Sequence, residues 1–132
     1  MRILELEGIE TVILAGIRAT SPDLNKSLKD AGVQVITSSQ FEEASGLSLS
    51  GPTYLTIDID LLDPAFAPGV GNPVPGGIGT RELIDTIHSF RFPIVGFDLV
   101  EVNPAYDHSA ITAAAGAKIV METIGHIVSG KT

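Results

Sequence analysis

The sequence predicts an α/β protein with three layers, in which a central parallel sheet lies between helices. Three observations support this fold class. Short apolar runs suited to strands alternate along the chain with segments of helical pattern. The helical segments between the runs provide the crossover connections that parallel strands require. The length of 132 residues, with 44% apolar and 18% charged residues, is typical of one globular domain and excludes disordered and fibrous proteins.

The first half of the chain predicts two strands and two helices. Residues 11–17 form a nearly continuous apolar run, as in a strand that is covered on both faces. A Ser-Pro pair at 21–22 begins a helix that continues to about residue 31, and Gly32 ends it. A second strand and a weaker helix follow at residues 33–36 and 40–44.

The second half predicts two more strands, two helices and a long loop. Residues 53–59 are the third strand, and residues 61–79 contain four Pro and five Gly, which neither a helix nor a ladder tolerates. Thr80 is a suitable N-cap for the next helix. The remaining elements are a helix at 80–90, a strand at 94–100, a turn at 103–108 and an Ala-rich helix at 109–128. The predicted sheet therefore has four parallel strands.

Charge and composition exclude several classes of partner. The formal net charge is −8 and the basic residues form no cluster, so a nucleic acid partner is not expected. The absence of cysteine excludes disulfides and thiolate metal sites and fits a reducing compartment. No continuous apolar run reaches the roughly 20 residues of a membrane span, and the acidic start is unlike a signal peptide. We therefore expect a cytoplasmic protein without membrane contact.

Asp58 and Asp60 are the main candidates for chemistry. Ligands of parallel sheets bind at the carboxyl ends of the strands, and two residues spaced by two on a strand point to the same face. Paired carboxylates repel each other unless a cation lies between them, and oxygen ligands suit Mg²⁺, Ca²⁺ or Mn²⁺. The alternative is that these residues cap the loop backbone. An Asp-x-Asp-x-Thr phosphotransferase is disfavoured because Leu62 replaces the threonine, and the sequence contains no Walker loop.

Several motifs together resemble the ureohydrolases, the family of arginases and agmatinases. The main one is Thr-Ile-Asp-Ile-Asp-Leu-Leu-Asp-Pro-Ala-Phe-Ala-Pro-Gly at residues 56–69, which continues into Pro-Val-Pro-Gly-Gly at 73–77. Residues 81–83 and 96–104 also resemble this family, and residues 106–112 resemble agmatinases more than arginases. The resemblance implies a partial arginase-like fold, with residues 1–132 as the C-terminal portion of a single ureohydrolase-like domain.

The resemblance also implies a reaction and a site. In the parent enzyme, a hydroxide between two manganese ions attacks a guanidino carbon, and agmatine is converted to putrescine and urea. Asp58 and Asp60 match metal-binding aspartates, and Glu101 matches the carboxylate that pairs with the small cationic guanidino substrate. An arginase or another guanidino-acid ureohydrolase is an alternative. A further alternative is an inactive fragment or a subunit that requires an N-terminal partner.

The sequence also departs from the family pattern. The Gly-Gly-Asp-His and Asp-Ala-His-x-Asp segments that supply the other metal ligands are absent, so the Mn²⁺ ligand set is incomplete. Val70 and Asn72 stand where the family more often has threonine. We expect weak manganese binding by this chain. An unpaired strand edge and an apolar helix face further predict a homo-oligomer or a complex with a complementing N-terminal half.

Two other acidic residues and the loop glycines are expected to be structural. Asp63, before Pro64, is predicted to hold the loop as a turn former rather than to bind metal. Asp98 lies within the fourth strand and is predicted to be a buried carboxylate that either supports the structure or orients the groups that bind metal and substrate. The glycines at residues 69–79 are interpreted as positions that permit positive φ.

The histidines and one arginine are also expected to be structural. His88 and His126 lie on predicted helices away from the strand ends, so we expect them at the surface or in packing. His108 lies beside Asp107 and is interpreted as part of a helix N-cap. Arg18 ends the first strand, where we expect a salt bridge on the rim of the sheet.

Overall fold

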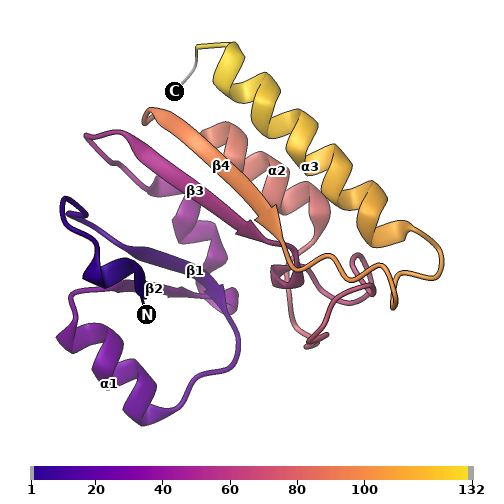
Figure 1. The fold of residues 1–132 in the computed structure, drawn as a ribbon, viewed down its shortest axis with the longest axis horizontal. Coiled ribbons are helices and arrows are strands. Elements are labelled where there is room, and N and C mark those ends of the chain that lie inside the picture. The colour runs from indigo at the N-terminus through magenta and orange to yellow at the C-terminus, as the bar shows by residue number, and fades with distance from the viewer. Residues whose placement is uncertain (1, 131–132) are drawn as a thin grey trace.

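The computed structural model describes residues 2–130 and consists of strands that alternate with helices (Figure 1). The α-helices and strands are β1 (Ile13–Ile17), α1 (Pro22–Asp30), β2 (Gln34–Thr37), β3 (Thr53–Asp58), α2 (Thr80–Ser89), β4 (Ile94–Val100) and α3 (Ile111–Val128). Short 3₁₀ segments are η1 (Arg2–Glu5), η2 (Ser38–Gly46) and η3 (Ile59–Leu61). The predicted α/β class is therefore confirmed.

The strands form two separate pairs. Within residues 2–130, β1 pairs in parallel with β2, and β3 pairs in parallel with β4. The 3₁₀ segment η2 contacts β1, β2 and α2, and so connects the two pairs. The predicted single sheet of four strands is wrong for this part of the chain, although the parallel orientation is right. β1 and β3 each keep one edge without a strand partner among the described residues.

The β1–β2 pair is only partly covered. Helix α1 contacts β2 and buries Leu28 on its inner face. The helix begins as predicted, because the Ser21 side chain accepts a hydrogen bond from the Leu24 amide at 3.2 Å. It ends before Gly32, whose φ of +73° is a left-handed conformation that glycine adopts without strain. Most residues of β1 are half-buried.

The β3–β4 pair carries helices on one face. Helix α3 packs on β4 and α2 packs beside α3, as Figure 1 shows. Ile57 of β3 is buried with apolar residues of α2 and with Ile119 of α3 in the main core. On the other face, Tyr54, Thr56 and Asp58 are exposed. A second helical layer over this face is therefore not formed by the described residues.

Two helix boundaries differ from the prediction. Helix α2 has Gly79 as its N-cap, and Thr80 is its first residue, so the predicted Thr80 cap is wrong. Helix α3 begins at Ile111 rather than at residue 109. The Asp107 carboxylate accepts the amides of Thr112 at 3.0 Å and Ala113 at 2.8 Å, which fixes the first turn at this point.

The Pro- and Gly-rich loop between η3 and α2 is ordered. Its apolar residues Leu62, Ala67, Val70 and Ile78 are buried. Bridges join Leu62 to Ile78 and Val70 to Val102. Of the loop glycines, Gly76 has a positive φ of +86°, whereas a Cβ on Gly77 would lie 2.4 Å from the Asp63 amide nitrogen. Backbone contact therefore explains Gly77 better than positive φ does.

Helix α3 is long and apolar enough to cross a membrane, judged by length and composition alone, with a mean hydropathy of 1.3. This qualifies the prediction from sequence, which considered only continuous apolar runs. The buried face of α3 contains Thr112, Ile119, Thr123 and His126 and packs against α2 and β4. Only 28% of the helix is buried, so α3 packs on the domain by one face and exposes the remainder.

Candidate functional site

Asp58 and Asp60 lie at the carboxyl end of β3, as predicted, but the strand does not run through both. Asp58 is the last residue of β3 and Asp60 belongs to η3. The Asp60 amide donates a hydrogen bond to Oδ1 of Asp58 at 3.0 Å, which starts the 3₁₀ turn. Ile59 between them is fully buried, while Asp58 is exposed and the Asp60 side chain is 27% exposed. The turn keeps both carboxylates near the surface.

The electrostatics of Asp58 show that acidic groups gather at this edge. Partial burial of the carboxyl raises the pKa of Asp58 most, and repulsion from Asp60 and Glu101 raises it further. The Asp60 amide and the Arg18 guanidinium act in the opposite direction. Asp58 therefore lies close enough to Asp60 and Glu101 for their negative charges to act on it.

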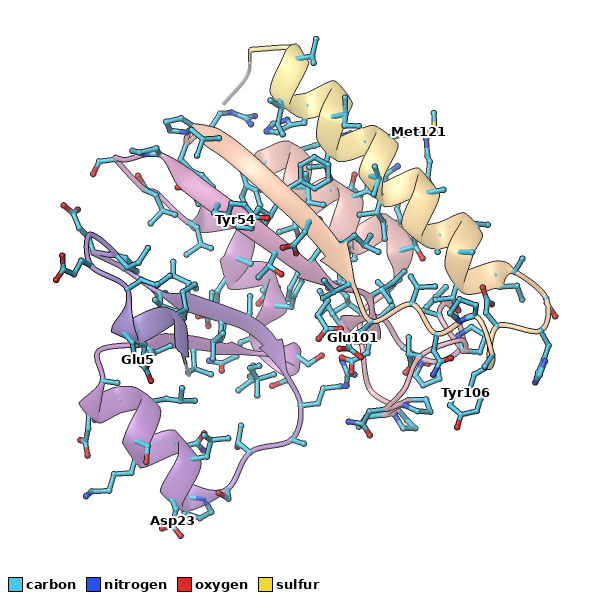
Figure 2. The ribbon with its side chains drawn as sticks, in the orientation of Figure 1. Glu5, Asp23, Tyr54, Glu101, Tyr106 and Met121 are labelled. Atoms are coloured by element: carbon cyan, nitrogen blue, oxygen red, sulfur yellow. The ribbon has the colours of Figure 1, made fainter. Side chains whose placement is uncertain are left out.

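Glu101 follows directly after β4 and has an unusual backbone conformation. Its φ is +69°, in the left-handed region, which costs a residue with a Cβ about 1–2 kcal/mol. The side chain is exposed near the ends of β3 and β4 (Figure 2). The loop approaches it, since a Cβ on Gly71 would lie 3.8 Å from Oε2 of Glu101. Strained residues of this kind concentrate at functional sites.

Arg18 connects the end of β1 to the turn that holds Asp60. Its Nη1 donates to the Leu61 carbonyl at 2.8 Å and its Nη2 donates to the Asp60 carbonyl. Nη2 also lies 3.8 Å from Oδ1 of Asp60, and the Arg18 side chain is only 10% exposed. The predicted salt bridge is present, but the carbonyl hydrogen bonds were not foreseen. They depend on contacts more than 40 positions away, for which the sequence carries no local signal.

Asp63 and Asp98 have structural partners. Asp63 accepts the amides of Ala65 at 2.9 Å and Gly76 at 2.8 Å, and these bonds lower its pKa. Its predicted role in holding the loop is confirmed. Asp98 accepts the hydroxyls of Tyr54 at 3.0 Å and Thr56 at 2.6 Å across the strand pair. Asp98 is structural as predicted, although it is half-buried rather than buried.

His88 and His126 lie outside this edge, and His108 plays no part in the cap of α3. His126 is buried and its ring stacks on His88 at 5.8 Å between centroids, so its predicted packing role is confirmed. His88 is partly exposed and its Nε2 lies 3.0 Å from Glu122. The cap of α3 comes from Asp107, and His108 is exposed beside it.

The acidic edge fits a divalent cation only in part. Carboxylate oxygens are suitable ligands for Mn²⁺. Over residues 2–130, however, no group of three or more His, Cys, Asp or Glu side chains comes together in a way that could hold a metal ion. Asp58 and Asp60 therefore remain predicted ligands that would need further donors.

Comparison with known proteins decides the family. A model of the arginase family matches residues 1–125. The chain belongs to the arginase family. Among its curated relatives, the agmatinase of Bacillus cereus is 40% identical over 129 residues, which cover 93% of this chain and 44% of that protein. The agmatinase of Proteus mirabilis is 49% identical over 98 residues, which cover 74% of this chain and 31% of that protein.

Solved structures agree with this assignment. An arginase from Medicago truncatula superimposes with a TM-score of 0.84 at 32% identity, over 96% of this chain and 42% of that one. The proclavaminate amidino hydrolase of Streptomyces clavuligerus superimposes with a TM-score of 0.80 at 35% identity, over 89% of this chain and 43% of that one. The predicted partial arginase-like fold is confirmed. This chain spans less than half the length of each of these four arginase-family relatives.

Proposed function

We propose that this arginase-family protein takes part in the hydrolysis of a guanidino group with release of urea, and that agmatine is the substrate. The observation that carries the proposal is that Asp58 ends β3 opposite Val100 of β4, so that Asp60 and Glu101 follow at the same edge of the strand pair. The agmatinase relatives from Bacillus cereus and Proteus mirabilis support this choice of substrate.

Glu101 is the residue that we assign to the substrate. A carboxylate and a planar guanidinium form a bidentate, charge-assisted pair, and Glu101 is exposed at the edge where the substrate would bind. In the overall reaction, water adds to the guanidino carbon, the bond from this carbon to the chain nitrogen breaks, and the products are urea and the amine putrescine. The net charge of −8 favours the approach of a cationic substrate.

Manganese is the cofactor that we propose for this reaction. Asp58 and Asp60 would contribute two of its carboxylate ligands. When bound, such ions supply a water of lowered pKa as the nucleophile. Because no group of three or more His, Cys, Asp or Glu side chains in residues 2–130 is arranged to hold a metal ion, we propose that a complementing N-terminal half supplies the other ligands. The strand edges of β1 and β3 that lack partners in the described residues give such a segment a place to pair. We further propose a cytoplasmic location, which the absence of cysteine fits.

Urea release tests the proposed function. We would assay agmatine and arginine with Mn²⁺, using the purified chain alone and the chain mixed with the part of the Bacillus cereus agmatinase that precedes the aligned region. We expect urea from agmatine only in the mixture. Glu101→Gln should reduce that activity by about 100-fold or more, because the side chain loses the negative charge that pairs with the substrate guanidinium. Glu82→Gln on α2 is the matched control and should leave it unchanged.

The other outcomes of this assay separate the alternatives. If the mixture released urea faster from arginine than from agmatine, the substrate would be a guanidino acid and not agmatine. No urea from any mixture that forms a folded complex would contradict the enzymatic proposal and favour an inactive fragment.

Calorimetry with Mn²⁺ tests the proposed ligands independently of activity. The isolated chain should bind Mn²⁺ weakly, and Asp60→Asn should weaken the binding further, whereas the control Asp23→Asn on α1 should not. Two tightly held manganese ions per isolated chain would show that the proposed need for other ligands is wrong.

A further inference from the structure

The outward face of α3 carries an apolar stripe along the whole helix. Its members are spaced alternately by three and four residues, which places them in one line on a helix. We call the outer stripe the set Ala114, Ala117, Met121, Ile124 and Val128. Met121 is 69% exposed and Val128 80% exposed. In Figure 2 the Met121 side chain points away from the rest of the molecule. Exposed apolar side chains in such a continuous line indicate an interaction surface.

The charges beside the outer stripe do not oppose self-association. Lys118 is the charged residue on the outward face, and its Nζ donates a hydrogen bond to Glu122 on the same helix. Glu122 in turn lies 3.0 Å from His88 of α2. The excess of acidic residues elsewhere in the chain is therefore not concentrated on this face.

We propose that the outer stripe is a contact with the outer stripe of a second copy of this chain, with the two α3 helices antiparallel about a twofold axis near Met121. The sizes of the residues carry this inference. In such a pair, residues whose numbers add up to about 242 face each other. Ala114 then faces Val128, Ala117 faces Ile124, and Met121 faces Met121 of the second copy. Each small residue meets a large one, as close packing of a self-complementary interface requires.

The neighbouring positions fit the same arrangement. Lys118 faces Gly125 of the second copy, and the glycine leaves room for the aliphatic stem while the ammonium group stays with Glu122. In a parallel pair, Ala114 would face Ala114 and Val128 would face Val128. The helices would then be too far apart at one end when they touch at the other. Antiparallel helices also align their dipoles favourably.

The size of the surface sets the strength of the association. Eighteen residues of helix are about 27 Å long, and one helix pair of that length buries less than the roughly 1,000 Å² of a stable interface. We therefore expect a weak, concentration-dependent dimer. A bilayer and the complementing N-terminal half are competing partners for an apolar helix face, but neither gives a reason for small and large residues to be placed symmetrically about Met121.

Charge substitution at the centre tests the axis. Sedimentation of the unmodified chain should show dimers at high micromolar concentration. Met121→Lys and Met121→Glu should each raise the apparent dissociation constant by about tenfold or more, because like charges then meet at the axis. An equimolar mixture of the two variants should associate again. Val95→Lys on β4 is the matched control, since Val95 is also 69% exposed, and it should leave association unchanged.

A size swap tests the antiparallel register. Ala117→Ile and Ile124→Ala should each weaken the dimer, by overpacking and by a cavity respectively. The double variant should recover most of the association, because the small and large residues face each other again. Circular dichroism of every variant should match the unmodified chain, as all substituted positions are exposed.

Three results would overturn the proposal. They are a monomer at all concentrations, a dimer that Met121→Lys leaves intact, and loss of the dimer in Val95→Lys instead, which would place the contact on β4. If the chain floated with anionic or neutral phosphatidylcholine-based vesicles and formed no dimers in solution, the outer stripe would be a membrane-binding surface and not a contact with a second copy. The outcome does not depend on the proposed function, since none of these residues belongs to the acidic edge.

Discussion

The β1–β2 and β3–β4 pairs have the same parallel pairing but differ in the helices that pack on them and in the residues at their carboxyl ends. β1 is mostly half-buried. Ile36 of β2 is 2% exposed and Ile57 of β3 is 3% exposed, and both lie in one core with residues of α2 and α3. β1 is followed by Arg18, which donates hydrogen bonds to the Asp60 and Leu61 carbonyls after β3. The carboxyl ends of β3 and β4 instead carry Asp58, Asp60 and Glu101. The β3–β4 pair therefore carries the candidate site, and Arg18 from the β1–β2 pair supports it.

The largest difference should appear in core substitutions. Ile57→Ala should lower the free energy of unfolding by about 3–4 kcal/mol, because a buried isoleucine leaves a cavity. The same substitution at half-buried Ile13 of β1 should cost about 1–2 kcal/mol. Urea unfolding measures both. Equal losses would show that Ile13 in β1 is as tightly packed as Ile57 in β3.

Removal of the link between the pairs should have a smaller effect. Arg18→Lys should cost about 2 kcal/mol, because a lysine cannot span the Asp60 and Leu61 carbonyls and leaves one unpaired. Arg81→Lys is the control. Arg81 pairs with Asp85 on the surface, each side chain being 65% exposed, and the change should cost less than about 0.5 kcal/mol. If the two variants unfolded alike, Arg18 would not connect the pairs energetically.

Relief of backbone strain should stabilise the site edge slightly. Glu101→Gly should raise the free energy of unfolding by up to about 1 kcal/mol, because glycine adopts the φ of +69° without a Cβ clash. It should also remove the proposed guanidinium contact. Glu82→Gly within α2 should instead lower stability by about 1 kcal/mol. Thermal unfolding compares the two, and destabilisation by Glu101→Gly would contradict the strain argument.

The smallest expected effects concern pH, and they have opposite signs at Asp58 and Asp63. Amide hydrogen bonds lower the pKa of Asp63 in the folded state. The ionised Asp63 carboxylate therefore stabilises the folded state above the unfolded pKa near 4, and this stabilisation is lost as pH falls through the folded pKa. The pKa of Asp58 is raised by burial, so the folded state loses stability as pH rises through that pKa. Asp63→Asn should flatten the acid limb of the stability curve. Asp58→Asn should stabilise the chain slightly at neutral pH, and chemical denaturation from pH 2 to 7 measures both.

The sequence was sufficient for most elements because their signals are local. The apolar run Ile94–Val100 and the Ser21 cap of α1 depend on neighbouring residues, and both agree with the structure. The position of Asp63 before a proline was likewise enough to predict its turn. The family motifs located Asp58, Asp60 and Glu101 at strand ends, although nothing in the structure tests their proposed roles.

The features that the sequence did not show depend on distant contacts or on side-chain hydrogen bonds. The division of the strands into two pairs depends on which edges meet in space, and strand pattern alone does not encode it. The alternation at residues 57–60 is compatible with a strand through Asp60, but the Asp60 amide bonds to Asp58 and the chain turns. The start of α3 depends on the Asp107 side chain, which reaches amides five and six positions ahead.

The contact of Gly69 with the first turn of α3 has a consequence for the speed at which the loop opens. The Gly69 amide donates to the buried Thr112 hydroxyl at 2.7 Å, and the Gly69 carbonyl accepts the Asn103 amide at 2.8 Å. A Cβ at Gly69 would lie 2.3 Å from Cβ of Asp107. The loop therefore lifts only when both of these hydrogen bonds break, and the Gly69 amide should exchange slowly with deuterium. A ligand reaching the acidic edge would meet a preformed rim rather than a flap that closes over it.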